Sequence, residues 1–191
     1  FDDRALSMVL MDDGRIVVGG YITGPSFDPD FAVLRLNADG SVDTSFGGDG
    51  LVIVDTSGDT SGDTGRAIAI DADGRVLIAG EASNFSVQGI AVLRLNTDGT
   101  VDTSFGTGGT VILDPAPDGV EMVSGIAVQD SGRILVSGTQ NTSNGDFMLI
   151  GLTSSGALDT SFGAAGTGIV LEDLSGFDDQ ALAMTLASDG S

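Results

Sequence analysis

A unit of about 60 residues recurs along the chain, and this periodicity restricts the fold more than any other feature of the sequence. Residues 177–191, FDDQALAMTLASDGS, restate residues 1–15, FDDRALSMVLMDDGR. The glycine that closes the first hairpin turn returns at Gly14, Gly74, Gly132 and Gly190. We therefore expect a single repeat domain over 1–191, made of repeat 1 (1–62), repeat 2 (63–119), repeat 3 (120–176) and the start of repeat 4 (177–191).

Each repeat contains the pattern of four short strands. In the first strand, Leu6, Met8 and Leu10 alternate with smaller or less apolar residues, and a period of two indicates a strand. A glycine-containing turn follows, as in a hairpin. The next three segments, RIVVGG, FAVLRLN and LVIVD with their copies, are apolar on both faces. Strands of that kind need cover on both sides.

The covering layers cannot be helices, because no segment shows a sustained period of 3.6 residues. Sheets must then cover sheets, and small four-stranded sheets packed face to face around an axis form a β-propeller. A β-trefoil and a parallel β-solenoid are the alternatives. The trefoil has no place for a fourth restart, and the solenoid has a shorter rung and fewer hairpins. We predict an all-β, propeller-type fold of four-stranded antiparallel blades, with about three blades and the first strand of a fourth in a partial ring.

The segments DDGRIVVGG and FAVLRLNADGSVDTSFGGDG, with their copies, resemble the bacterial delta-60 repeat, a β-propeller-type repeat family of uncharacterised function. The resemblance covers nearly all of the chain. The third copy departs most, with Gly151 in place of the strand arginine and Thr153 in place of asparagine. The resemblance implies a secreted or cell-surface bacterial protein built of modules, and it offers no catalytic residue for transfer.

Composition removes several classes of function. Asp and Glu number 28 against 7 Lys and Arg, a net charge of −21, and such a field repels nucleic acid and anionic lipid. The apolar runs are too short for membrane insertion. The chain has no Cys, His or Lys, which excludes thiol and imidazole catalysis, Schiff bases and Cys/His metal sites. We expect no nucleic-acid binding, no required cofactor and no enzymatic activity.

The DTSFG segment favours a structural role. Its aspartate, Asp43 in the first copy, suits an Asx turn, and Phe46 is placed to fill the space between blades. Gly47 then supplies a positive φ. Arg35 lies inside an apolar strand and needs a carboxylate partner, for which the repeated aspartate is the natural candidate.

The preceding residues NADGSVD offer oxygen atoms at alternate positions, as a calcium loop does. Arg35 stands at the first position of that pattern and the twelfth has no Glu, so an EF-hand is excluded while a looser calcium site stays open. The weak calcium candidates are Asn37, Asp39, Asp43, Asn96, Asp98 and Asp102.

The segments that join the second and third strands differ between repeats, as binding loops on a rigid scaffold do. They span 21–31, 81–89 and 139–147. Aromatic and amide groups suited to carbohydrate lie there: Tyr21, Phe27, Asn84, Phe85, Gln140 and Asn141.

We therefore expect a non-enzymatic structural and binding module, with adhesion or ligand binding as its role. The alternatives are a carbohydrate-binding or glycoside-cleaving propeller using Asp or Glu, and a spacer without ligand. Expected partners are the neighbouring blades of a parent chain or a homo-oligomer that completes the ring, together with a glycan or a surface protein. Two copies would give six blades, although residues 1–15 and 177–191 would then compete for one strand position. That redundancy favours the other interpretation, in which the sequence is a piece of a longer propeller.

Overall fold

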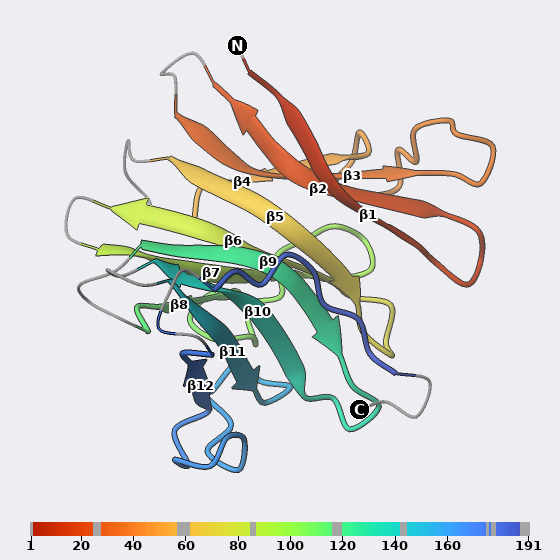
Figure 1. The fold of residues 1–191 in the computed structure, drawn as a ribbon. Helices are drawn as coiled ribbons and strands as arrows, with labels where there is room; N and C mark the ends of the chain where they lie inside the picture. Colours follow the sequence, from red (N-terminus) through yellow and green to blue (C-terminus); the bar gives the residue numbers. More distant parts are fainter. Residues whose placement is uncertain are drawn as a thin grey trace.

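Three four-stranded antiparallel sheets make up the fold, each formed by consecutive strands within one repeat (Figure 1). The computed structural model describes residues 2–24, 28–56, 62–84, 87–115, 120–141, 145–174, 176 and 179–187. Blade one contains β1 (Arg4–Leu10), β2 (Ile16–Thr23), β3 (Pro29–Leu36) and β4 (Leu51–Val54); blade two contains β5 (Asp63–Ile70), β6 (Val76–Asn84), β7 (Val87–Leu95) and β8 (Thr110–Leu113); blade three contains β9 (Val120–Val128), β10 (Ile134–Asn141), β11 (Asp146–Leu152) and β12 (Ile169–Glu172). The predicted all-β partial propeller is confirmed.

The blades stack face to face, so that the middle blade is covered on both sides. One core lies between blades one and two and includes Val33 and Ile78; a second lies between blades two and three and includes Leu77 and Val136. Neighbouring residues of β6 thus point into different cores, as a strand that is apolar on both faces requires. The first strands β1, β5 and β9 lie next to one another along one edge of the stack (Figure 1).

The strands run further than the sequence predicts. The β2–β3 ladder continues to the pair Thr23 and Pro29, and the β10–β11 ladder continues to Gln140 and Asp146. Much of the three expected loops is therefore strand, because backbone pairing continues beyond the apolar residues that mark a strand in sequence. Among the residues described, no helix has the length and hydrophobicity needed to cross a bilayer.

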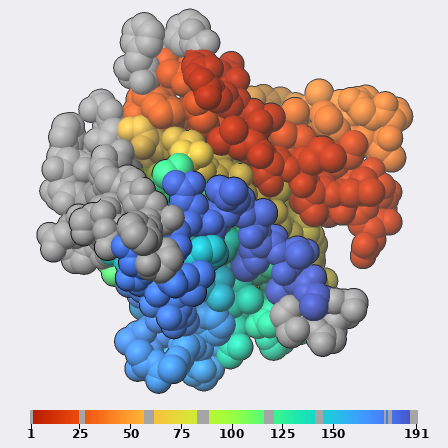
Figure 2. Space-filling view, in the orientation of Figure 1, coloured from red at the N-terminus to blue at the C-terminus, as the bar shows by residue number. Residues whose placement is uncertain are grey.

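The described part of the fourth repeat, residues 179–187, lies against blade three, at the surface between that blade and β1 (Figure 2). The amide of Asp179 donates to the carbonyl of Gly145 at 2.7 Å, and the amide of Ala181 donates to Oγ1 of Thr139 at 3.0 Å. A Cβ at Gly125 of β9 would lie 3.0 Å from Met184. Residues 179–187 thus continue the row of first strands without a strand partner of their own in the part of the chain described.

Candidate functional site

The DTSF segment forms a repeated ion-pair network between blades. Nε of Arg35 donates to Asp43 Oδ2 at 2.7 Å, which confirms the predicted pairing. The other carboxylate oxygen accepts from the amide and the hydroxyl of Ser45, the predicted Asx turn. The Ser45 hydroxyl, with the guanidinium of Arg35, lowers the pKa of Asp43 to about 2. The Arg35 guanidinium also lies over the ring of Phe46, 4.5 Å from its centre, and that ring is fully buried.

The same arginine joins each blade to the next. Arg35 Nη1 donates to the carbonyl of Thr97 in blade two at 2.5 Å, and Arg94 Nη1 donates to the carbonyl of Ser154 in blade three at 2.6 Å. Gly99 allows a close approach of the two blades here, because a Cβ there would lie 2.5 Å from the backbone nitrogen of Gly47. We interpret the network as structural: it fixes the geometry between neighbouring blades, and its arginine and aspartate side chains are engaged in contacts within the chain.

Blade three shows how the network survives without its strand arginine. The hairpin residue Arg133 donates from Nε to Asp159 Oδ2 at 2.6 Å and from Nη2 to Ser161 at 3.0 Å. The ring of Phe162 occupies the space over Gly151, where a Cβ would lie 2.6 Å from it. Ser161 and Arg133 lower the pKa of Asp159 to about 2. A second arginine thus replaces the first.

The calcium candidates lie in exposed turns or in this network. Asp39 accepts from the amide and hydroxyl of Ser41, and Asp98 accepts from those of Thr100; in both cases the hydroxyl lowers the carboxyl pKa. Asn37 and Asn96 donate to the same two hydroxyls. Asp43 and Asp102 are held by arginine. No cluster of three or more acidic side chains suited to a metal occurs within the described residues. A calcium site stays a prediction.

Each first strand contains a β-bulge, and the residue at the bulge differs from blade to blade. In the β1–β2 ladder Ala5 and Ser7 pair with consecutive residues of β2, so Leu6 has no cross-strand partner. The bulged residues of blades two and three are Arg66 and Ser124, which stand at the equivalent positions of their repeats. A bulge turns its extra residue away from the regular alternation of the strand. Each blade therefore presents one residue without a ladder partner along the row of first strands.

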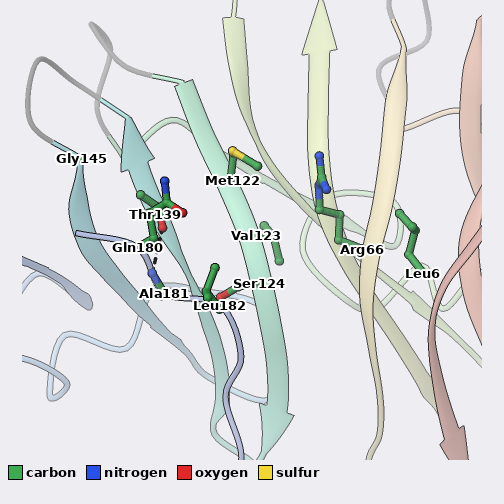
Figure 3. A pocket seen from close by; sticks show the side chains of 10 residues that line it. All are labelled: Leu6, Arg66, Met122, Val123, Ser124, Thr139, Gly145, Gln180, Ala181 and Leu182. Carbon is green, nitrogen blue, oxygen red and sulfur yellow. Dashed lines mark hydrogen bonds between the residues drawn. The ribbon is translucent and has the colours of Figure 1, made fainter. Parts of the chain in front are cut away.

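These side chains converge on one pocket of about 340 Å³ (Figure 3). Leu182, the equivalent residue of the fourth repeat, lies on its wall as well. The remaining lining residues are Met122, Val123, Thr139, Gly145, Gln180 and Ala181. The pocket thus combines apolar walls with one guanidinium, two hydroxyls and one amide.

Glu81 forms an ion pair with Arg66 and holds its guanidinium in place. Its Nε donates to Glu81 Oε2 at 2.5 Å, while Oε1 accepts from the amide of Val123 in blade three at 2.8 Å. Burial raises the pKa of Glu81, against the opposing effect of the Arg66 hydrogen bond. Glu81 therefore links two residues that line the pocket, Arg66 of blade two and Val123 of blade three, and orients the Arg66 guanidinium.

Of the six predicted loop residues, the two whose side chains the structure describes lie on different blades. Tyr21 is a half-buried residue of β2, and Gln140 is a buried residue of β10, so both belong to strands of different blades. Asn84 and Asn141 end β6 and β10, and their side chains lie outside what the structure describes. Phe27 and Phe85 lie outside the described residues altogether.

Sequence reasoning missed the bulge, although glycine marks it. Opposite the bulge stand Gly20, Gly80 and Gly138, and a Cβ at Gly80 would lie 1.9 Å from the carbonyl oxygen of Thr64. An isolated glycine inside a strand is the usual sign of such a close approach. These glycines repeat, while the bulged residue changes from leucine to arginine to serine. That contrast identifies the pocket.

Comparison with known proteins places the chain in a family. No curated protein matches it. Among solved structures, a novel α-L-arabinofuranosidase from Clostridium thermocellum ATCC 27405 is similar with a TM-score of 0.44 and 14% identity, over 89% of this chain and 50% of that one. The chain thus spans half the length of that structure. The family described as "domain of unknown function (DUF5122) beta-propeller" matches residues 12–46, 72–105 and 129–162, which is more than half of the chain. The chain belongs to this β-propeller family.

Proposed function

We propose that the chain is a non-enzymatic binding module that holds a carbohydrate in the pocket lined by its bulged residues. The observation that carries the proposal is the contrast between a repeated scaffold and one position that varies. Leu6, Arg66 and Ser124 occupy the same bulge in successive blades and face one pocket. Scaffold positions repeat because packing fixes them, whereas a bulged position, which has no ladder partner, can change residue type and adapt to a ligand.

The chemistry of the lining suits a sugar. A sugar ring carries several hydroxyl groups and an apolar face of C–H bonds. The hydroxyls find partners in Arg66, Thr139 and Gln180, and the apolar face finds Leu6 and Leu182. A few polar groups on a largely apolar wall are typical of small-molecule sites.

Binding is a better fit than cleavage at this pocket. Glycoside hydrolysis ordinarily uses two carboxylates that flank the scissile bond. Glu81, the carboxylate beneath the pocket, already accepts hydrogen bonds from Arg66 and from the amide of Val123. Its role is to orient the arginine. The likeness to the delta-60 repeat supports an extracellular bacterial setting, and a surface glycan is the partner that such a module would meet.

A glycan array probed with the chain of residues 1–191 tests the proposal, followed by titration of any glycan retained. The key variant is Ser124→Leu, because leucine already occupies the equivalent bulge at Leu6 and at Leu182. The Ser124 and Ser137 hydroxyls lie 3.1 Å apart, so this variant loses one hydrogen bond and should melt at a slightly lower temperature while staying folded. We expect it to weaken glycan binding at least about tenfold by filling the pocket. The matched control Ser45→Ala changes a hydroxyl away from the pocket and should bind normally. An array without binding, or equal affinities for Ser124→Leu and the parent chain, would refute the proposal.

A further inference from the structure

Arg66 is the only charged residue among the described residues that line the pocket (Figure 3), and Glu81 balances its charge. The Nε atom of Arg66 donates to Glu81 Oε2 at 2.5 Å, and the other oxygen of Glu81 accepts from the amide of Val123 at 2.8 Å. Both side chains of the ion pair are partly buried, with 36% of Arg66 and 21% of Glu81 exposed. The guanidinium thus comes with its own counter-ion, and the pair carries no net charge.

The ion pair leaves the terminal nitrogens of Arg66 available to a ligand. Within the described residues Arg66 interacts through Nε, and Nη1 and Nη2 have no partner there. A guanidinium presents its N–H groups in a fixed planar fork, which can donate to two neighbouring oxygen atoms of one ligand. In a neutral sugar these are two adjacent hydroxyl groups, and in an acidic sugar they are the two oxygens of one carboxylate. The charges around the pocket decide between these two classes of ligand.

The charges around the pocket disfavour an anion. Acidic residues stand next to lining residues at Glu121, Asp146 and Asp179, whereas no arginine does, and the chain as a whole has a net charge of −21. Because Glu81 already neutralises Arg66, a carboxylate in the pocket would find no further cation among the described lining residues. A charge that leaves water without a counter-ion costs far more free energy than a hydroxyl group does.

The oxygen atoms that line the pocket favour a ligand that can also donate hydrogen bonds. Oγ1 of Thr139 accepts from the amide of Ala181, the Ser124 hydroxyl lies on the same wall, and Gln180 adds an amide carbonyl. A sugar hydroxyl both donates and accepts, so it suits these oxygens as well as the N–H groups of Arg66, whereas a carboxylate can only accept. Hydrogen bonding and charge thus favour the same class of ligand.

We propose that the pocket selects neutral saccharides and rejects saccharides that carry an acidic group on the ring it holds. This inference rests on the proposed function of the pocket as a carbohydrate site, and it specifies which carbohydrates the site takes. The terminal nitrogens of Arg66 bind two adjacent hydroxyl groups of the sugar. Glu81, which is not among the lining residues, acts as a positioning residue: it orients the guanidinium and supplies the repulsion that excludes acids.

Matched sugars test the selectivity directly. Glucose, galactose and mannose differ from their uronic acids only at C6, so a glycan array that displays both members of each pair as terminal residues compares charge at nearly constant shape. We expect the chain of residues 1–191 to retain neutral members, and titration to show binding at least about tenfold weaker for the uronic acid of the same pair. Preferential retention of uronic acids, or equal affinities within a pair, would overturn this inference and leave the carbohydrate site in place. An array that retains no sugar would instead overturn the proposed function, and the inference with it.

Two carboxylate variants test whether Glu81 is the source of the selectivity. Glu81→Gln removes the charge that balances Arg66, so the ratio of affinities between a neutral sugar and its uronic acid should fall several-fold. Glu172→Gln is the matched control, because Glu172 is an exposed residue at the end of β12 and its replacement changes the net charge by the same amount. This control should leave the ratio unchanged. An equal fall in both variants would show that the net charge of the chain excludes acids, and would overturn the role of Glu81. Thermal melts confirm that each variant is folded, and the comparison of matched sugars on the parent chain depends on neither variant.

Discussion

Replacement of Arg94 by alanine tests the energetic role of the inter-blade network. The Arg94 side chain is only 5% exposed, and its Nε donates to Asp102 at 2.8 Å. Removing one partner of a buried ion pair costs about 3–5 kcal/mol, because the other charge stays buried without compensation. Here Arg75 Nη1 already lies 3.5 Å from the same carboxylate. A shift of Arg75 onto Asp102 would restore one charge-assisted hydrogen bond, worth about 1.5–3 kcal/mol. We therefore expect Arg94→Ala to lower the free energy of unfolding by about 2 kcal/mol.

The reserve arginine makes the two positions non-additive. Arg75→Ala alone should cost about 0.5 kcal/mol, because its ion pairs are partly exposed. The double variant removes both guanidinium groups and should cost about 4 kcal/mol, an excess of at least about 1 kcal/mol over the two single changes. Blade three supplies the structural precedent, since Arg133 alone holds Asp159.

Urea unfolding followed by far-UV circular dichroism measures these differences, since the chain has one Tyr and no Trp. Arg4→Ala is the control, because Arg4 forms an exposed ion pair with Asp2. Its unfolding midpoint should not change. Additive losses in the double variant, or an Arg94→Ala variant as stable as the parent chain, would refute the argument that Arg75 acts as a reserve.

Three further changes probe the packing and the pocket. Gly80→Ala should lower the free energy of unfolding by about 3 kcal/mol or more, since its Cβ would lie 1.9 Å from the Thr64 carbonyl oxygen. Gly40→Ala should lower it by about 1 kcal/mol, because Gly40 has φ +85° but nothing within 4 Å of its Cβ position. Equal losses of stability in thermal melts would contradict the close approach at Gly80. Phe105→Ala should cost about 3–5 kcal/mol, and Phe162→Ala clearly less, because of these two rings only that of Phe105 is fully buried between two blades. Chemical denaturation that ranks them otherwise would contradict the role of this phenylalanine in filling the space between blades. Folding raises the pKa of Glu81, so the protonated carboxyl is the form that the fold favours, and the stability this gives below about pH 4.5 is lost as the pH rises through the raised pKa. The glutamine side chain of Glu81→Gln stays neutral, so the free energy of unfolding of this variant, relative to the parent chain, should increase between pH 4 and pH 7. Urea unfolding at several pH values measures this difference. A difference independent of pH would show that burial is not the main influence on the Glu81 pKa.

The fold could be predicted because its causes are local and repeated. Strands such as FAVLRLN are apolar on both faces, and without helices only neighbouring sheets can cover them. The Arg35–Asp43 pair could be predicted for a similar reason, since a buried cation needs an anion and the repeat supplies one at a fixed spacing. In both cases the chemistry of a few adjacent residues determines the outcome.

The remaining features depend on contacts between blades. Gly151 stands where the other blades have a strand arginine, and Arg133 takes over the ion pair with Asp159. The sequence does not predict this replacement, because Arg133 and Gly151 are far apart along the chain and are brought together only by the fold. Residues 179–187 have the sequence of a strand, yet within the described part of the chain they belong to no ladder. The pocket could not be predicted from the residues that line it, because the bulge that builds it is marked in the sequence by Gly80 on the opposite strand.

The bulge has a consequence for how such a protein changes over time. A residue without a cross-strand partner can be exchanged without disturbing the ladder, and glycine on the neighbouring strand keeps the backbone geometry whatever the bulged side chain is. Leucine, arginine and serine already occupy this position in one chain. Each added blade therefore contributes one residue that can vary without a change to the ladder, and if the pocket binds a glycan as proposed, exchanging these single residues would alter its specificity on an unchanged scaffold.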